Sequence, residues 1–294
     1  MDFNTLSAFF ISGDVRGAIE YLGSFPELSE LTSAYIRLFR EEEYVKYDIL
    51  PVLERILLEY QKYYRDVFYT RTDDAEASAK LMRALSLLLG VSDDEEKIAE
   101  KLSEIFEENG YHIKTGRTHG HYGPYVWKNT EKKEYEVELP EGNGSYTVNI
   151  LSGFIMCSWM DYITFGRFGT RGWADEGGIN CIEGRYDFES EAFTVSLLKH
   201  EAQHVMDMKR FPDITPAELE YRAKLVELIY SSDRNLILKF LGEADLTKTD
   251  DSHAYASAKL KENFGYTDGM SLDDVKRRAG ELFSVSHETW STYN

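Results

Sequence analysis

The chain has 294 residues, which is enough for one large domain or for two modest ones that each bury a core. Hydrophobic residues make up 43% of it, so the composition is that of a globular protein and excludes a disordered one. Acidic residues outnumber basic ones by 52 to 33, which gives a formal net charge of -19. Because a surface of this sign repels phosphate groups, we expect neither nucleic acid nor a membrane as a partner.

The cysteines and the N-terminal segment bear on the cellular compartment. Cys157 and Cys181 are too few for a disulfide scaffold, and their spacing is not that of a CxxC zinc site. The N-terminal segment starts with an acidic residue and lacks the basic stretch of a secretory signal. No stretch reaches the roughly 20 apolar residues that a membrane span requires. These features predict a cytoplasmic protein.

Residues 1–110 are predicted to be helical nearly throughout, because apolar residues recur there at three- and four-residue spacing. Pro51 is placed at the start of a helix of about five turns. The next helix is expected to end around Gly90. The stretch "SDDEEKIAEKLSEIFEENG" then predicts a helix with Ser92 as its N-cap, acidic residues in its first turn and Gly110 at its end.

Strand signals begin after this helical region. Residues 134–140 and 145–151 alternate apolar and polar side chains around a "PEGNG" turn, which predicts a β-hairpin. A Gly-rich stretch follows, with a short strand expected at 179–182, and helices return to the end of the chain. The order favours an α+β fold. It comprises an all-helical region at 1–110, followed by a domain at 111–294 with a small antiparallel sheet.

The run "LLKHEAQHVMD" at 197–207 contains the strongest functional signal. His200 and His204 are four residues apart, so on a helix both point the same way. Two imidazole nitrogens can then reach one ion at ~2.0–2.1 Å. Glu201 leaves the helix about 100° further round, close enough to hold a water molecule without becoming a ligand. This H-E-x-x-H spacing predicts zinc bound by His200 and His204, with Glu201 as general base.

The run resembles the active-site helix of the zincin metallopeptidases. The resemblance implies a zincin-like catalytic domain, a zinc cofactor, and hydrolysis of peptide bonds in a peptide or protein substrate by a zinc-activated water. It also implies a third ligand downstream. One zincin branch supplies a histidine six residues after the second one, with a glycine between. Asp207 and Arg210 occupy those two positions here, which disfavours that branch.

The sequence after this helix predicts a short turn and a second helix. Thr215 suits the N-cap, Pro216 the first helical position, and Glu218 the third position of a capping box. Because the turn is short, the two helices are expected to run antiparallel.

The antiparallel arrangement places two acidic residues near the histidines. Glu220 stands level with His204, and Glu227 stands beyond His200 on the same helix face. The geometry therefore favours Glu220 as the third ligand, with Glu227 as second choice. In addition, "EYRAK" resembles the E-[FY]-x-A-D element with which several glutamate-type zincins supply their third ligand.

One position departs from that family element. Lys224 stands where the family has an acid that supports a ligating histidine, and such a histidine needs an acceptor for its other ring nitrogen. Asp207 or Glu227 can supply one. The departure also supports an alternative function, a catalytically inactive zincin-fold binding or regulatory protein.

Three further features are weaker candidates. Residues 165–182 precede the active-site helix, where zincins commonly bind peptide, so they are expected to border a substrate cleft. His119 and His121 form an H-x-H pair that can bind metal if extended, although their glycine neighbours favour a loop. The donor that would stabilise a developing oxyanion is left open among His253, Tyr255 and His287.

Overall fold

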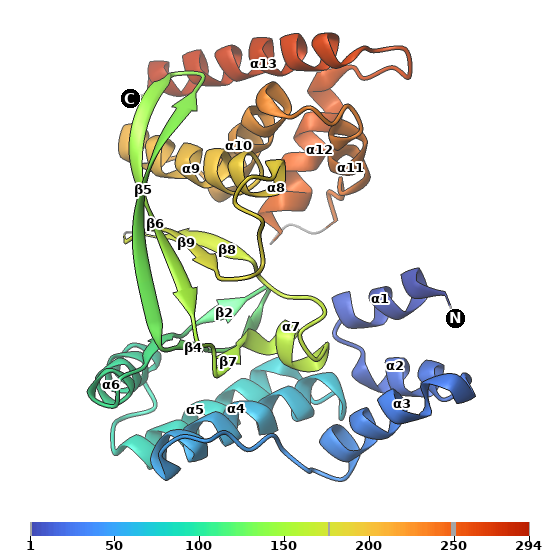
Figure 1. Ribbon diagram of the computed structural model, residues 1–294, viewed down its shortest axis with the longest axis vertical. Helices are drawn as coiled ribbons and strands as arrows, with labels where there is room; N and C mark the ends of the chain where they lie inside the picture. The colour runs from blue at the N-terminus through green and yellow to red at the C-terminus, as the bar shows by residue number, and fades with distance from the viewer. Residues whose placement is uncertain (1, 176, 248–250, 294) are drawn as a thin grey trace. The chain divides into compact units, whose positions relative to one another are not determined.

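The computed structural model describes residues 2–175, 177–247 and 251–293 (Figure 1). The chain divides into two compact units, and each is built from two segments of sequence. The first unit combines the chain up to residue 129 with 152–170, and the second combines 130–151 with 171–294. The region 1–110 lies wholly in the first unit, which also takes in strands and a helix from further along the chain.

Helices make up most of the first unit, as the apolar spacing predicted. Pro51 is the first residue of its helix, because a proline there gives up an N–H that would have no partner in any case. The helical segments, including the short 3-10 segment η1 and the π segment η2, are α1 (Phe3–Ile11), α2 (Val15–Leu22), η1 (Pro26–Leu28), α3 (Ser29–Tyr35), η2 (Ile36–Arg40), α4 (Pro51–Phe68), α5 (Asp74–Leu89), α6 (Glu95–Glu108) and α7 (Ser158–Ile163).

The ends of α5 and α6 follow local capping chemistry. The side chain of Asp73 accepts hydrogen bonds from two backbone N–H groups at the start of α5, and Gly90 ends that helix with a φ of 69°. The prediction of Ser92 as the N-cap of α6 is wrong. Asp94 is the N-cap, since its carboxylate accepts from the N–H three residues on, and Ser92 lies two positions too early.

Aromatic side chains form much of the core of the first unit. Tyr60, Tyr63 and Tyr64 of α4 are buried, and Trp159 of α7 stacks on Phe68 with ring centroids 4.7 Å apart. Two small antiparallel sheets complete the unit. One pairs β1 (His112–Lys114), β4 (Tyr125–Trp127) and β7 (Met156–Cys157), and the other pairs β2 (Arg117–Thr118) with β3 (His121–Tyr122).

The second unit contains a four-stranded sheet. Its order is β5 (Asn129–Leu139), β6 (Gly142–Ser152), β9 (Gly178–Ile182) and β8 (Gly172–Asp175). The predicted hairpin is present as β5 and β6, joined by a two-residue turn. The prediction of a purely antiparallel sheet is wrong, because β6 and β9 pair in parallel. The chain leaves the unit after β6 and returns before β8, and this long connection allows a parallel neighbour.

Helices pack on one face of this sheet. Ile179 and Cys181 of β9 are fully buried in one apolar cluster with Ala202 and Leu225, which belong to successive helices. The helices are α8 (Glu191–Thr194), α9 (Leu198–Arg210), α10 (Pro216–Tyr230), α11 (Leu236–Gly242), α12 (Ser252–Phe264) and α13 (Leu272–Tyr293). The fold of the described residues is thus mixed α+β, with α9 and α10 anchored on the sheet.

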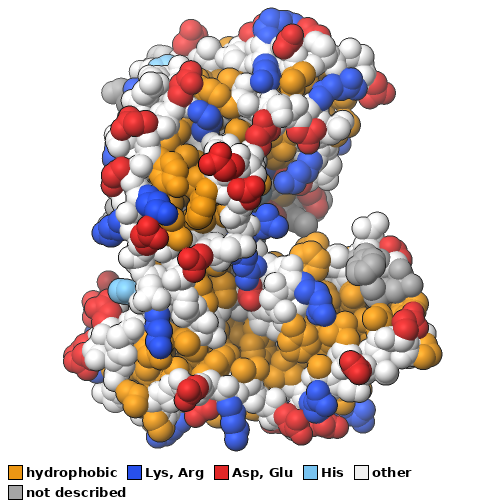
Figure 2. Space-filling model, viewed as in Figure 1, with side chains coloured by type: hydrophobic (Ala, Val, Ile, Leu, Met, Phe, Trp, Pro, Cys, Tyr) orange, Lys and Arg blue, Asp and Glu red, His pale blue; other side chains and the backbone are white. Residues whose placement is uncertain are grey.

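Two properties of the described chain concern its surface. Figure 2 shows acidic and basic side chains interspersed on the visible face, so the net charge of -19 is not gathered into one acidic patch there. In the part of the chain that the structure describes, no helix combines the length and the apolar character needed to cross a membrane.

Candidate metal centre

The two helices that carry the predicted site are joined by a short turn. The side-chain oxygen of Thr215 accepts a hydrogen bond from the backbone N–H of Glu218, and Pro216 is the first residue of α10, as predicted. The other half of the predicted capping box, in which the Glu218 side chain bonds back to the start of the helix, is wrong. The Glu218 carboxylate instead forms an ion pair with Lys259 and accepts a hydrogen bond from the indole of Trp290, so it ties α10 to α12 and α13.

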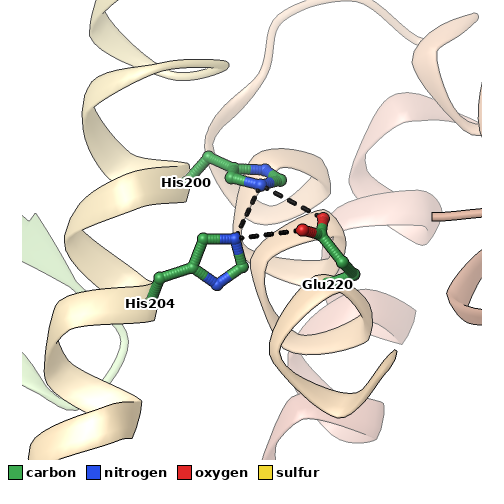
Figure 3. Close-up of side chains that lie close together, drawn as sticks. All are labelled: His200, His204 and Glu220. Carbon is green, nitrogen blue, oxygen red and sulfur yellow. Dashed lines mark hydrogen bonds and ion pairs between the residues drawn. The ribbon is translucent and has the colours of Figure 1, made fainter. Parts of the chain in front are cut away.

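His200, His204 and Glu220 lie together. Both imidazoles project from α9 toward the carboxylate on the neighbouring α10 (Figure 3). The Nε2 atoms of the two histidines are 3.0 Å apart, and each is 3.4 Å from one oxygen of Glu220. Both histidines are buried, with 8% of their surface exposed. The three side chains that the sequence analysis predicted as ligands therefore lie next to one another in the fold.

The spacing of these atoms fits a single metal ion. Donors that bind one ion tetrahedrally at ~2.0–2.1 Å stand about 3.3 Å from each other. The two imidazole nitrogens are close to that separation, and each faces a different oxygen of Glu220, so the carboxylate can reach an ion bound by both rings. Glu220 Oε2 is also buried without a hydrogen-bond donor, which is costly unless a cation compensates it. Two imidazoles and a carboxylate form a donor set for zinc and for other divalent transition ions.

Glu227 completes the surroundings of the first histidine. Its Oε1 lies 2.7 Å from His200 Nδ1. A carboxylate only accepts hydrogen bonds, so Nδ1 carries a proton, and a metal ion that displaces the second ring proton would meet the Nε2 lone pair, which faces Glu220 and His204. Glu227 therefore takes the place of the supporting acid, three residues beyond the position where the family element has it.

The electrostatics of the cluster favour a cation. Burial lowers the pKa of His200, but the ion pairs with Glu220 and Glu227 outweigh burial and raise this pKa to about 10. Burial also opposes ionisation of Glu220, yet the neighbouring imidazoles of His200, His204 and His253 hold the pKa of this carboxyl well below its usual range. The carboxylates beside the imidazoles thus generate the negative potential that attracts a divalent ion.

The cluster opens into a pocket of about 350 Å³ that contains Glu201. Within the described residues, the Glu201 carboxylate has no hydrogen bond or ion pair, so it is free to act on a molecule in the pocket. Besides Glu201, the pocket is lined by Gly172, Trp173, Ala174, His200, His204, Met208, Pro216, Leu219, Glu220 and His253.

Of the three candidate oxyanion donors, His253 alone lines this pocket. Its Nδ1 is 2.9 Å from Glu220 Oε2, although the angle is not that of a hydrogen bond. Tyr255 is exposed and borders a different pocket. His287 forms an ion pair with Glu141 and is not among the residues that line the site.

Lys224 and Asp207 both point to other partners. Lys224 is buried and forms an ion pair with Glu243 at 2.7 Å, so its ammonium group is directed to Glu243 and not to a ligating histidine. Asp207 contacts Arg222 and Gln203 rather than a ligating histidine, so the expectation that it supports a histidine is wrong. His204 Nδ1 has no hydrogen-bond partner among the described residues.

The remaining predicted candidates separate in the same way. His121 pairs with Asp74 at an Nδ1–Oδ1 distance of 2.9 Å, and the H-x-H pair forms no metal cluster within the described chain. Of the stretch 165–182, only Gly172–Ala174 of β8 border the pocket. The sequence analysis missed β8, whose signal was a short "GWAD" run hidden among glycines. It also missed the buried Arg222, which nothing in the pattern distinguished from a surface arginine.

The comparisons with known proteins provide no relative. No protein-family model matches the chain, and neither the characterised proteins nor the solved structures include a match.

Proposed function

We propose that this chain is a zinc-dependent metallohydrolase with a zincin-like catalytic domain, most simply a peptidase that acts on a peptide or protein substrate. One observation carries the proposal. Side chains from two neighbouring helices bring three ligand atoms within 4.8 Å of one another, and Glu201, which has no protein partner among the described residues, lies in the same pocket.

His200, His204 and Glu220 would hold the ion. A bound zinc ion would supply Lewis acidity, polarising a carbonyl group and making water more acidic. The Glu201 carboxylate would accept the proton of the attacking water and return it to the leaving amine. Glu227 would keep His200 oriented through Nδ1, so that the Nε2 lone pair points into the cluster.

The two edges of the four-stranded sheet support an extended peptide as substrate. β5 carries six charged side chains along its length, which discourages pairing with another strand. β8 presents "GWAD", and its first three residues border the pocket. An extended chain that pairs with β8 would therefore pass the Glu201 carboxylate.

The alternative is a binding or regulatory protein without catalytic activity. Lys224 favoured that alternative because it stands where the family element has the acid that supports a ligating histidine. Glu227 supplies such an acid from one turn further along α10, and Lys224 is engaged elsewhere. This observation supports the enzyme over the alternative.

Metal analysis is the first test. Protein purified without chelator should contain about one zinc per chain, since a single three-ligand site is expected. Replacing His200 and His204 together with alanine should reduce that content to background. A protein that binds no divalent metal would contradict the proposal.

Hydrolysis is the second test. Glu201→Gln should lower peptide hydrolysis by roughly 10²–10⁴-fold, the usual contribution of a general base, and leave the zinc content unchanged. Glu262→Gln is the matched control, because Glu262 is an exposed glutamate of α12 outside the pocket lining. If zinc is bound but no member of a broad peptide library is cleaved, the binding-protein alternative replaces the peptidase.

A further inference from the structure

A second buried polar cluster lies on α9 and α10 beside the metal centre. Asp207 and Arg222 are fully buried, and the Arg222 Nε donates to Asp207 Oδ2 at 2.8 Å. The other oxygen of Asp207 accepts from Gln203 Nε2 at 2.9 Å. Asp207 comes three residues after His204, and Arg222 comes two after Glu220. The ion pair therefore links the two helices within about one turn of the ligands that each supplies.

The same arginine reaches two further elements. Arg222 Nη2 donates to Glu141 in the β5–β6 turn at 3.1 Å, and Nη1 donates to Ser286 of α13 at 3.4 Å. Glu141 also accepts a hydrogen bond from Gln203 Nε2 at 3.2 Å and forms an ion pair with Arg210 Nη1 at 3.0 Å. One planar guanidinium thus fixes α10 against α9, the hairpin and α13 at once, which a lysine ammonium is poorly shaped to do.

We infer that the Asp207–Arg222 pair is a positioning device for the metal centre, setting the axial alignment of α9 against α10 so that Glu220 meets the two histidines. This inference rests on the metal site proposed above. Neither residue contacts the ligand atoms, so both are positioning residues and not catalytic ones.

The argument depends on how narrowly a metal site tolerates displacement. Ligand groups must be held within about 0.5 Å of their productive positions, and a helix that slides by one residue moves its side chains by about 1.5 Å. Glu220 is on α10 and both histidines are on α9, so only the packing between the helices brings them together. Apolar contacts alone permit such sliding, whereas a directional ion pair with short hydrogen bonds does not.

The chain provides a matched control two residues away. Lys224 is also a buried cation of α10, with 3% of its surface exposed. Its partner is Glu243, just after α11, and its ammonium lies 4.2 Å from the centre of the Phe240 ring. Loss of Lys224 therefore removes a buried charge from the same helix without loosening the contact between α9 and α10.

The test compares zinc affinity in the full-length Asp207→Leu/Arg222→Met double variant and in Lys224→Met. Removing both charges of a buried pair is often neutral for stability, so the double variant should fold. Its zinc affinity should be at least about tenfold weaker, the lower end of the effect seen for residues that orient ligands from outside the coordination sphere. Lys224→Met should bind zinc like the wild type. Cobalt(II), whose visible absorption reports coordination geometry, should give an altered spectrum in the double variant only.

Each outcome is decisive. Wild-type zinc affinity and an unchanged cobalt spectrum in a folded double variant would overturn the inference and leave the metal site standing. Equal losses in both variants would also overturn it, since they would indicate general destabilisation. If the double variant does not fold, Arg222→Lys keeps the charge but not the planar fork, and the same comparison applies to it. A wild-type chain that binds neither zinc nor cobalt would overturn the proposed function together with this inference.

Discussion

Two clusters of buried polar side chains lie about one turn apart on the same face of α9, and they differ in how completely their groups are paired. In the ligand cluster, the Nε2 atoms of His200 and His204 converge with Glu220, whose Oε2 lacks a hydrogen-bond donor. In the Asp207 cluster, both oxygens of Asp207 accept hydrogen bonds from neighbouring side chains, Arg222 among them. A buried group that is fully paired needs nothing further, whereas converging acceptor atoms require a positive charge between them, which a ring proton or a metal ion can supply. The contrast distinguishes a structural cluster from a candidate binding site on one helix.

The largest effect should come from breaking the Asp207 cluster. Arg222→Met alone leaves Asp207 as a buried charge without its cation, so the free energy of unfolding should fall by about 3–5 kcal/mol. Urea denaturation measures this loss. Lys224→Met should cost less, because its partner Glu243 has 37% of its side chain exposed and can be solvated. Equal losses in the two variants would mean that the Asp207 cluster is no more tightly coupled than any other buried ion pair.

The ligand cluster should contribute added stability only when metal is present. Zinc at about 100 times its dissociation constant should raise the free energy of unfolding of the wild type by about 2.7 kcal/mol, since it binds the folded state. His204→Ala should abolish this gain, because it removes one of three ligands. Thermal unfolding with zinc and with a chelator measures both. A variant that is still stabilised by zinc would show that the ion binds somewhere else.

Glu227 should have an intermediate effect. Glu227→Gln keeps the size of the side chain but replaces the charged acceptor at His200 Nδ1, so zinc should bind about 10–100-fold more weakly. The change is about 1.4–2.7 kcal/mol in binding free energy. Competition with a chromophoric chelator measures it, and Glu243→Gln is the control on the partner of Lys224. Unchanged affinity in Glu227→Gln would mean that His200 needs no charged partner.

Local signals explain what the sequence predicted well. The spacing of His200 and His204, the turn that ends at Thr215 and the position of Glu220 all follow from helix geometry and capping within a stretch of about 20 residues. The helices of the first unit were likewise predictable from apolar spacing and from Pro51. In each case the determining contacts lie close together in the sequence.

Long-range contacts explain what the sequence did not show. The parallel pairing of β6 with β9 depends on a connection that passes through the other unit, and no local pattern encodes it. Arg222 acquires its role from Glu141, 81 residues away in the chain. Asp207 and Glu227 were both candidates to support a histidine, and only their tertiary contacts decided between them, because Glu227 meets His200 whereas Asp207 meets Arg222.

A polar cluster in the first unit provides a reference for complete pairing. Asp74 accepts hydrogen bonds from Tyr63 at 2.7 Å and from Arg117 at 2.8 Å, and it pairs with His121. Burial raises the pKa of this carboxyl, but the hydrogen bonds from Arg117, Tyr63 and His121 outweigh burial and lower it to about 2. Like the Asp207 cluster of α9, this cluster uses protein partners alone.

The smallest expected effect is a dependence of stability on pH that is independent of metal. The pKa of Asp74 is lower in the folded chain than the 3.8 of an unperturbed aspartate, so the ionised carboxylate stabilises the fold above pH 4. That stability should disappear as pH falls from about 4 to 2, and because the side chain is one-third exposed, solvent limits it to about 1 kcal/mol. Urea denaturation of wild type and Asp74→Asn across this range should converge at low pH. Since the cluster contains none of the proposed metal ligands, a chelator should leave the stability difference between wild type and Asp74→Asn unchanged. If zinc altered that stability difference, the distinction between fully paired clusters and the ligand cluster would no longer hold.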